Sequence, residues 1–121
     1  MKYVAKFGID GGVSHGFGLK ESDYSEKEEI FELEIADDER AFAKAGILAY
    51  KLSKNSLSNP ETDETKVTLL NLFDEKKEIN QKNFVSKYDG FKNKNGKSIS
   101  FKTEKNKMVF ICSQLEHLLS L

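Results

Sequence analysis

Residues 2–9 read Lys-Tyr-Val-Ala-Lys-Phe-Gly-Ile, and their strict alternation is the pattern on which the fold depends. One face of an extended chain would carry the apolar side chains of Tyr3, Ala5, Phe7 and Ile9. The other face would carry Lys2, Val4, Lys6 and Gly8. A period of two residues is typical of a half-buried strand, so we predict a strand here.

Residues 28–36 alternate in the same way and predict an antiparallel partner for this first strand. Phe31, Leu33 and Ile35 would face one side, while Ile30 and the acidic positions would face the other. A strand with one apolar and one acidic face indicates a sheet that is open to water on one side.

The segment after residue 36 changes to helical spacing. Asp37 and Asp38 are typical helix-start residues, and we predict a long helix over residues 38–55. Its buried face would consist of Phe42, Ala45, Ala49 and Leu52.

The rest of the chain predicts short strands and one more helix. Strands are expected over residues 65–73, near 78–79, and over 98–103 and 108–112, followed by a short C-terminal helix that contains Leu115, Leu118 and Leu119. The expected fold class is α+β, with a mostly antiparallel sheet of about five or six strands, one long central helix and a short C-terminal helix.

Length and composition favour one soluble domain over residues 1–121. Hydrophobic residues make up 38% of the chain and charged residues 32%. No apolar run approaches the roughly 18 residues of a membrane span, and no signal peptide is visible at the start. The single Cys112 excludes an internal disulfide framework, so we expect a cytoplasmic protein that does not act on membranes.

The net charge of −1 conceals a strong separation of charge along the chain. Residues 21–40 hold ten acidic and two basic residues, whereas residues 76–107 hold ten lysines and three acidic residues. Within the acidic run, Glu28, Glu32 and Glu34 would share the exposed strand face, and we predict that they bind a basic partner. The alternative is that the acidic and basic regions pair with one another, within the fold or between the subunits of a homo-oligomer.

A glycine-rich loop over residues 10–18 is the most distinctive motif. Successive glycines allow backbone N–H groups to converge on an anion, so the loop is a candidate phosphate site. The residues of this candidate site are Asp10, Gly11, Gly12, Ser14, His15 and Gly16. The competing interpretation is a glycine-rich hairpin tip without a ligand.

Residues 8–14, Gly-Ile-Asp-Gly-Gly-Val-Ser, resemble the first phosphate loop of the actin, sugar-kinase and Hsp70 ATPase superfamily. The resemblance implies a hairpin next to a nucleotide phosphate. That superfamily encloses its nucleotide between two large lobes, which 121 residues cannot supply. We therefore interpret the similarity as one of chance.

No catalytic or metal-binding constellation is evident. Ser14 and His15 are adjacent in sequence and lack an assignable orienting carboxylate, and Cys112 follows an apolar run typical of a core strand. The two histidines have no metal-ligand spacing. We expect no enzyme activity, cofactor or metal.

Two functions from different classes remain open at this point. The leading hypothesis is a small non-catalytic binding protein of the inhibitor or immunity type, made by a bacterium or phage, that engages a protein partner through its charged surface. The alternative is a nucleotide or phosphate binder that uses the loop over residues 10–18 at an oligomer interface. Nucleic-acid binding through the lysine-rich segment ranks third, since the chain has one arginine against eighteen lysines.

Overall fold

The computed structural model describes residues 1–10, 24–56, 66–88, 91–92, 98–99, 101–104 and 107–111. In chain order its elements are β1 (Lys2–Asp10), β2 (Tyr24–Glu32), α1 (Asp38–Ser56), β3 (Lys66–Phe73), α2 (Lys82–Tyr88), β4 (Phe91–Lys92), β5 (Ser98–Ile99), β6 (Phe101–Glu104) and β7 (Lys107–Ile111).

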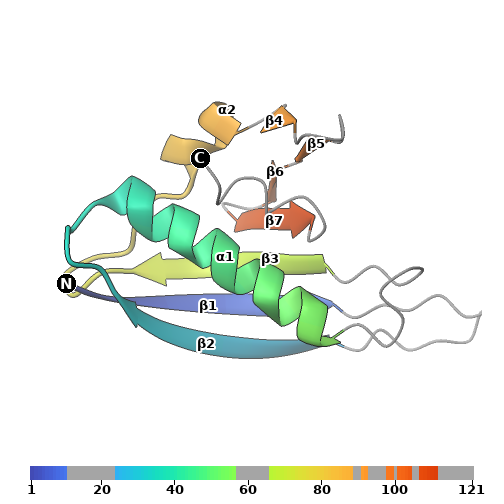
Figure 1. The fold of residues 1–121 in the computed structure, drawn as a ribbon, viewed down its shortest axis with the longest axis horizontal. Coiled ribbons are helices and arrows are strands. Elements are labelled where there is room, and N and C mark those ends of the chain that lie inside the picture. The colour runs from blue at the N-terminus through green and yellow to red at the C-terminus, as the bar shows by residue number, and fades with distance from the viewer. Residues whose placement is uncertain are drawn as a thin grey trace, which may run out of the picture.

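Five of these strands form one antiparallel sheet in the order β2-β1-β3-β7-β6. The helix α1 runs diagonally across one face of this sheet and packs against β1, β3 and β7 (Figure 1). Among the described strands, the two short strands β4 and β5 pair with each other alone and form a separate ribbon beyond β6.

The core lies between α1 and the sheet, and the predicted faces supply it. The predicted inward side chains of β1 are buried, as are all four predicted contacts of α1, from Phe42 to Leu52. Phe42 is fully buried at the centre, where its ring lies 5.4 Å from Phe84, 6.1 Å from Phe101 and 6.0 Å from Phe110. Each buried aromatic side chain of this kind contributes about 1.5–3 kcal/mol through removal from water.

The helix α1 begins where the acidic residues predicted it would. The carbonyl of Asp37 accepts the first helical hydrogen bond from the N–H of Ala41 at 2.9 Å. Asp38 and Glu39 follow in the first turn, where negative charge is favourable.

A β-bulge in β3 accounts for its buried pattern. Lys6 pairs with Asn71 and Phe7 with Leu69, which leaves Leu70 as an extra residue. The bulge shifts the alternation, so that Leu69 and Leu72 both face the core. The freed carbonyl of Leu70 accepts a hydrogen bond from the side chain of the buried Gln81 at 3.3 Å.

The architecture predicted from the sequence is wrong in how it divides the strands and in lacking the helix α2. We expected about five or six strands in one sheet, whereas the described strands divide between a five-stranded sheet and the separate β4–β5 ribbon. The predicted strand near residues 78–79 is only an isolated bridge from Phe73 to Glu78, and the predicted strand over residues 98–103 is split into β5 and β6.

The second described helix, α2, occurs in a segment for which the sequence predicted no helix. It has seven residues, too few for a helical periodicity to be visible. Its start depends on Asn80, whose side chain accepts the N–H of Lys82 at 3.0 Å. The predicted C-terminal helix, with Leu115, Leu118 and Leu119, lies outside the described residues.

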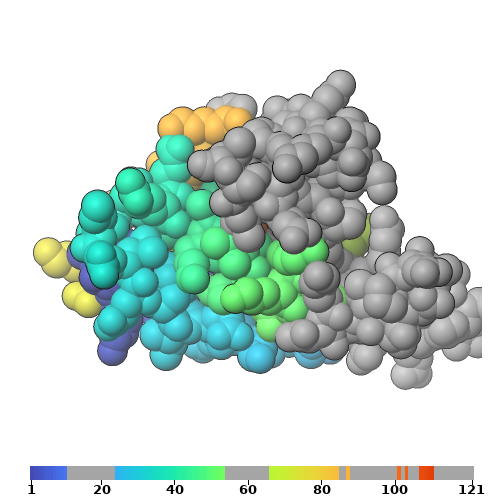
Figure 2. All heavy atoms as spheres, in the orientation of Figure 1, coloured from blue at the N-terminus to red at the C-terminus, as the bar shows by residue number. Residues whose placement is uncertain are grey.

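Figure 2 shows the helix-covered side of the molecule, where side chains of α1 and of β2 meet in one continuous surface. Neither helix in the described part of the chain has the length and apolar character needed to cross a lipid bilayer.

Candidate functional site: the open face of the sheet

The second face of the sheet is the candidate functional surface, because none of the described elements covers it. Tyr3, Ala5, Phe7 and Ile9 of β1 point to the helix side, so the alternate positions point away from the helix. In register across β1 and β2, the pairs on this open face are Lys2 with Glu32, Val4 with Ile30, Lys6 with Glu28, Gly8 with Glu26, and Asp10 with Tyr24.

The structure places two of the three predicted acidic residues together on this face. Glu28 and Glu32 are both exposed and both lie on the open side of β2. Glu34 is also exposed, but β2 ends at Glu32, so Glu34 lies beyond the strand that was predicted to hold it. The prediction missed Glu26, because β2 begins at Tyr24 rather than at residue 28.

Glu26 is held by its neighbours. Its carboxylate accepts a hydrogen bond from the Tyr24 hydroxyl at 3.0 Å and lies 3.3 Å from the Lys6 ammonium. The Tyr24 hydrogen bond and the Lys6 ammonium together lower the pKa of Glu26 below its ordinary value. Partial desolvation and the same hydrogen bond raise the pKa of Tyr24.

Glu28, Glu32 and Glu34 differ from Glu26, because they form no ion pair with any residue that the structure describes. Lys6 is opposite Glu28 in register, yet its ammonium binds Glu26 instead. Two acidic residues of the strand face are therefore left available to a partner.

Pairing between the acidic and basic regions occurs at a different place, the start of α1. Lys77 lies 3.7 Å from Asp38, and Lys87 lies 2.6 Å from Glu39. The internal-pairing alternative thus holds for this end of the acidic run. On the open face of β2, Glu28 and Glu32 form no ion pair with the described residues of the basic region, whereas the charge of Lys107 helps to lower the pKa of Glu26.

An exposed apolar row crosses the open face next to these carboxylates. Val4 is in register with Ile30 on one side and with Phe73 on the other, so the three side chains occupy neighbouring strands. Ile30 is 66% exposed and Phe73 38% exposed, although both are large apolar residues. Contiguous exposed apolar side chains with a polar surround are typical of interaction surfaces.

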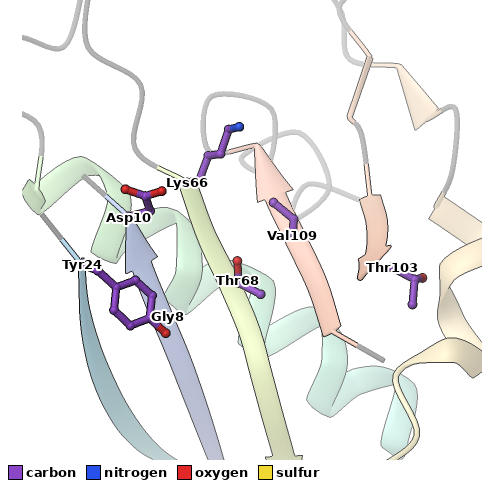
Figure 3. A pocket seen from close by; sticks show the side chains of 7 residues that line it. All are labelled: Gly8, Asp10, Tyr24, Lys66, Thr68, Thr103 and Val109. Atoms are coloured by element: carbon purple, nitrogen blue, oxygen red, sulfur yellow. The ribbon is translucent and has the colours of Figure 1, made fainter. Parts of the chain in front are cut away.

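A cavity of about 510 Å³ opens at the other end of the same face. Figure 3 shows the ring of Tyr24 lying over Gly8, with Asp10 and Lys66 at the strand ends and Thr103 apart from the rest. The lining residues are Gly8, Asp10, Tyr24, Lys66, Thr68, Thr103 and Val109. Gly8 allows this close approach, since a Cβ atom at this position would lie 2.6 Å from the Tyr24 hydroxyl oxygen and the Tyr24 side chain would have to shift.

This cavity contains one residue of the predicted phosphate site. Asp10 is exposed at the end of β1 and lines the cavity. The remaining residues of that prediction lie outside the described part of the chain: Gly11, Gly12, Ser14, His15 and Gly16. Sequence reasoning missed Lys66 and Thr68, because only strand pairing brings β3 beside Asp10.

The described residues hold no group of three His, Cys, Asp or Glu side chains that could bind a metal ion. Ser14, His15 and Cys112, which were considered for nucleophilic chemistry, lie outside the described residues. What the open face offers chemically is therefore charge, apolar contact and a hydrogen-bonding strand edge.

Comparison with known proteins gave no matching family model, no matching curated protein and no matching solved structure.

Proposed function

We propose that the protein is a non-catalytic binding protein of the inhibitor or immunity type, which acts in the cytoplasm and docks a basic protein partner on its open sheet face. The observation that carries this proposal is the placement of Glu28 and Glu32. Both carboxylates are exposed, both lack an ion pair among the described residues, and the exposed Ile30 lies between them on the same face.

The two kinds of contact on this face would act at different ranges. Unpaired carboxylates attract a basic partner over roughly a Debye length, about 8 Å at physiological salt, and so raise the association rate. The apolar row of Ile30, Val4 and Phe73 would then supply short-range burial once the partner is in contact. An arrangement of this kind favours binding and includes no reacting group.

The proposal is tested by capturing partners from the native host with matched baits and quantifying them by mass spectrometry. The variants Glu28→Lys and Glu29→Lys change the net charge equally. Glu28 lies on the open face, whereas Glu29 is opposite Ala5 and points to the helix side. We expect a basic protein that the wild type and Glu29→Lys capture equally and that Glu28→Lys captures severalfold less. Equal capture by all three baits, or a partner without net positive charge, would contradict the proposal.

A second candidate function has its own observation, the cavity beside Asp10. Lys66 and Thr68 provide an ammonium group and a hydroxyl group that could hold an anionic ligand such as a nucleotide phosphate, although the Asp10 carboxylate would oppose it. Thermal unfolding with ATP or inorganic phosphate tests this candidate. Stabilisation of the wild type that is lost in Lys66→Gln would support it, and the absence of any stabilisation of the wild type would exclude it.

A further inference from the structure

We propose that the partner binds by adding a strand to the outer edge of β2, and that this strand carries basic, apolar and basic side chains at alternate positions. This inference rests on the proposed function, since it specifies how the partner is held and what its chemistry is. It concerns the backbone of β2, whereas the proposed function concerns side-chain charge.

The hydrogen-bond phase of β2 shows which backbone groups lie at its outer edge. The amine of Met1 donates to the carbonyl of Leu33 at 2.9 Å, and the N–H of Leu33 donates to the carbonyl of Met1 at 3.1 Å. Residues that exchange both bonds alternate along an antiparallel pair with residues that exchange none. The residues of β2 bonded to β1 are therefore Ser25, Lys27, Glu29 and Phe31.

The intervening residues of β2 direct their N–H and C=O groups away from β1. Among the described strands β2 is outermost and pairs on one side only. The outward groups belong to Tyr24, Glu26, Glu28, Ile30 and Glu32, which are the same residues whose side chains lie on the open face. A strand that pairs with this edge would thus place alternate side chains directly beside Glu28, Ile30 and Glu32.

The charge pattern of the sheet indicates what those side chains should be. On the open face β1 contributes Lys2 and Lys6, and β2 contributes glutamates beside them. A third strand continues this alternation if it presents Lys or Arg beside Glu28 and Glu32 and an apolar residue beside Ile30. Because this order reads the same in both directions, it holds for an antiparallel or a parallel partner strand.

Charge also argues against a second copy of this chain as the occupant. Antiparallel self-pairing centred on Glu28 sets that carboxylate against its own copy, and pairing centred on Ile30 sets Glu28 against Glu32. Like charges directly opposite each other on neighbouring strands are destabilising. Acidic side chains along an exposed edge therefore disfavour its own copy and favour a basic strand.

The first test uses the synthetic peptide Thr-Lys-Thr-Val-Thr-Lys-Thr as the probe, with binding measured by fluorescence anisotropy at low salt. Glu28→Gln removes the carboxylate and keeps the edge N–H, whereas Glu28→Pro removes both. Proline is tolerated at an outward edge position, where it breaks no bond to β1. We expect the proline variant to bind about tenfold more weakly than the glutamine variant. Equal binding by both would overturn strand addition.

The second test leaves the protein unaltered and so does not depend on the folding of a variant. One peptide is N-methylated at Val and another at the Thr that follows Val. The N–H groups of these two consecutive residues point to opposite sides of a strand. In antiparallel pairing we expect only the N-methyl-Val peptide to lose affinity, about tenfold. Loss with N-methyl-Thr alone would also support strand addition, with a parallel partner. Equal binding by both peptides, or equal loss, would overturn it.

These results are distinguishable from failure of the proposed function. Suppose that the peptide binds the wild type, binds Glu28→Lys more weakly, and shows no further loss of affinity with Glu28→Pro or with N-methylation. In that case the proposed function holds, with the Glu28 carboxylate as part of the docking site, and strand addition at the edge of β2 is overturned. If a single-stranded oligonucleotide or a second copy of the chain occupies β2 in place of the basic peptide, this inference is overturned.

Discussion

The carboxylates along β2 differ in their contacts, because Gly8 leaves room for the Tyr24 ring beside Glu26. Without a Cβ at Gly8, the Tyr24 ring lies across β1 and its hydroxyl reaches Glu26, with Lys6 on the other side of the carboxylate. Glu28 is two residues further along and lies opposite Lys6 in register, but it forms no ion pair with any described residue. At the scale of single residues, Glu26 is therefore held by two neighbours, whereas Glu28 and Glu32 are exposed and form no ion pair with the described residues.

We predict that Tyr24→Phe raises the pKa of Glu26 toward its ordinary value, because the variant removes the hydrogen bond that is the largest single cause of the lowered pKa. A pKa that is lowered in the folded state gives stability that is present at neutral pH and is lost as the pH falls through the folded pKa. NMR titration of the Glu26 carboxyl carbon checks this, and Lys6→Gln should act in the same direction. An unchanged Glu26 pKa in Tyr24→Phe would contradict the assigned hydrogen bond.

At the scale of elements, α1 and β2 have opposite roles in the sheet. The helix buries Phe42, Ala45, Ala49 and Leu52 against β1, β3 and β7, so its stripe stabilises the fold. The strand β2 buries Phe31 and keeps its remaining side chains partly or fully exposed. A strand at the edge of a sheet that contributes little to the core is available to bind a partner.

We predict that Leu52→Ala lowers the free energy of unfolding by about 2–5 kcal/mol, since Leu52 is buried against the sheet. Lys51→Ala is the control, because Lys51 is the adjacent exposed position of α1 and should change stability by less than about 0.5 kcal/mol. Urea denaturation measures both. A cost near zero for Leu52→Ala would show that this stripe does not pack against the sheet.

We predict an alternating pattern of amide hydrogen exchange along β2 in the free protein. The amides of Lys27, Glu29 and Phe31 bond to β1 and should exchange slowly, while those of Glu28 and Ile30 face outward and should exchange rapidly. Two-dimensional NMR in D₂O resolves the individual amides. Uniform protection along β2 would mean that another segment or another molecule already occupies the edge.

The sequence predicted the elements in which apolar residues recur at a regular spacing over many residues. It missed the elements that depend on contacts between residues far apart in the chain. The buried faces of β1 and α1 follow from spacings of two and about 3.6 residues, and Glu28 and Glu32 follow from the same alternation in β2. The bulge at Leu70 could not be foreseen, since its carbonyl is satisfied by Gln81, eleven residues away.

The candidate surface was only partly predictable for a related reason. The apolar row exists because Val4 is in register with both Ile30 and Phe73, and strand register is a property of the whole sheet. The cavity likewise needs Lys66 beside Asp10. The elements α2, β4 and β5 have seven, two and two residues, which is too short to leave a periodic signal.

At the scale of the whole molecule, charge separation along the chain becomes two different arrangements in space. The acidic residues at the start of α1 pair with Lys77 and Lys87 from the basic segment. Glu26, Glu28 and Glu32 of β2 lie on the open face instead, beside the apolar row. Exposed ion pairs contribute about 0–1 kcal/mol each, so the pairs at the start of α1 add little stability. The glutamates on the open face of β2 would instead act on the rate at which a partner associates.

The most direct test of this account is the rate of association between the protein and the basic partner that it captures, measured by stopped flow at increasing salt. We predict that Glu28→Lys with Glu32→Lys slows association severalfold, that Glu29→Lys changes it much less, and that salt slows the wild type. Association that is independent of salt and unaffected by the double substitution would contradict Glu28 and Glu32 of the open face as the docking site.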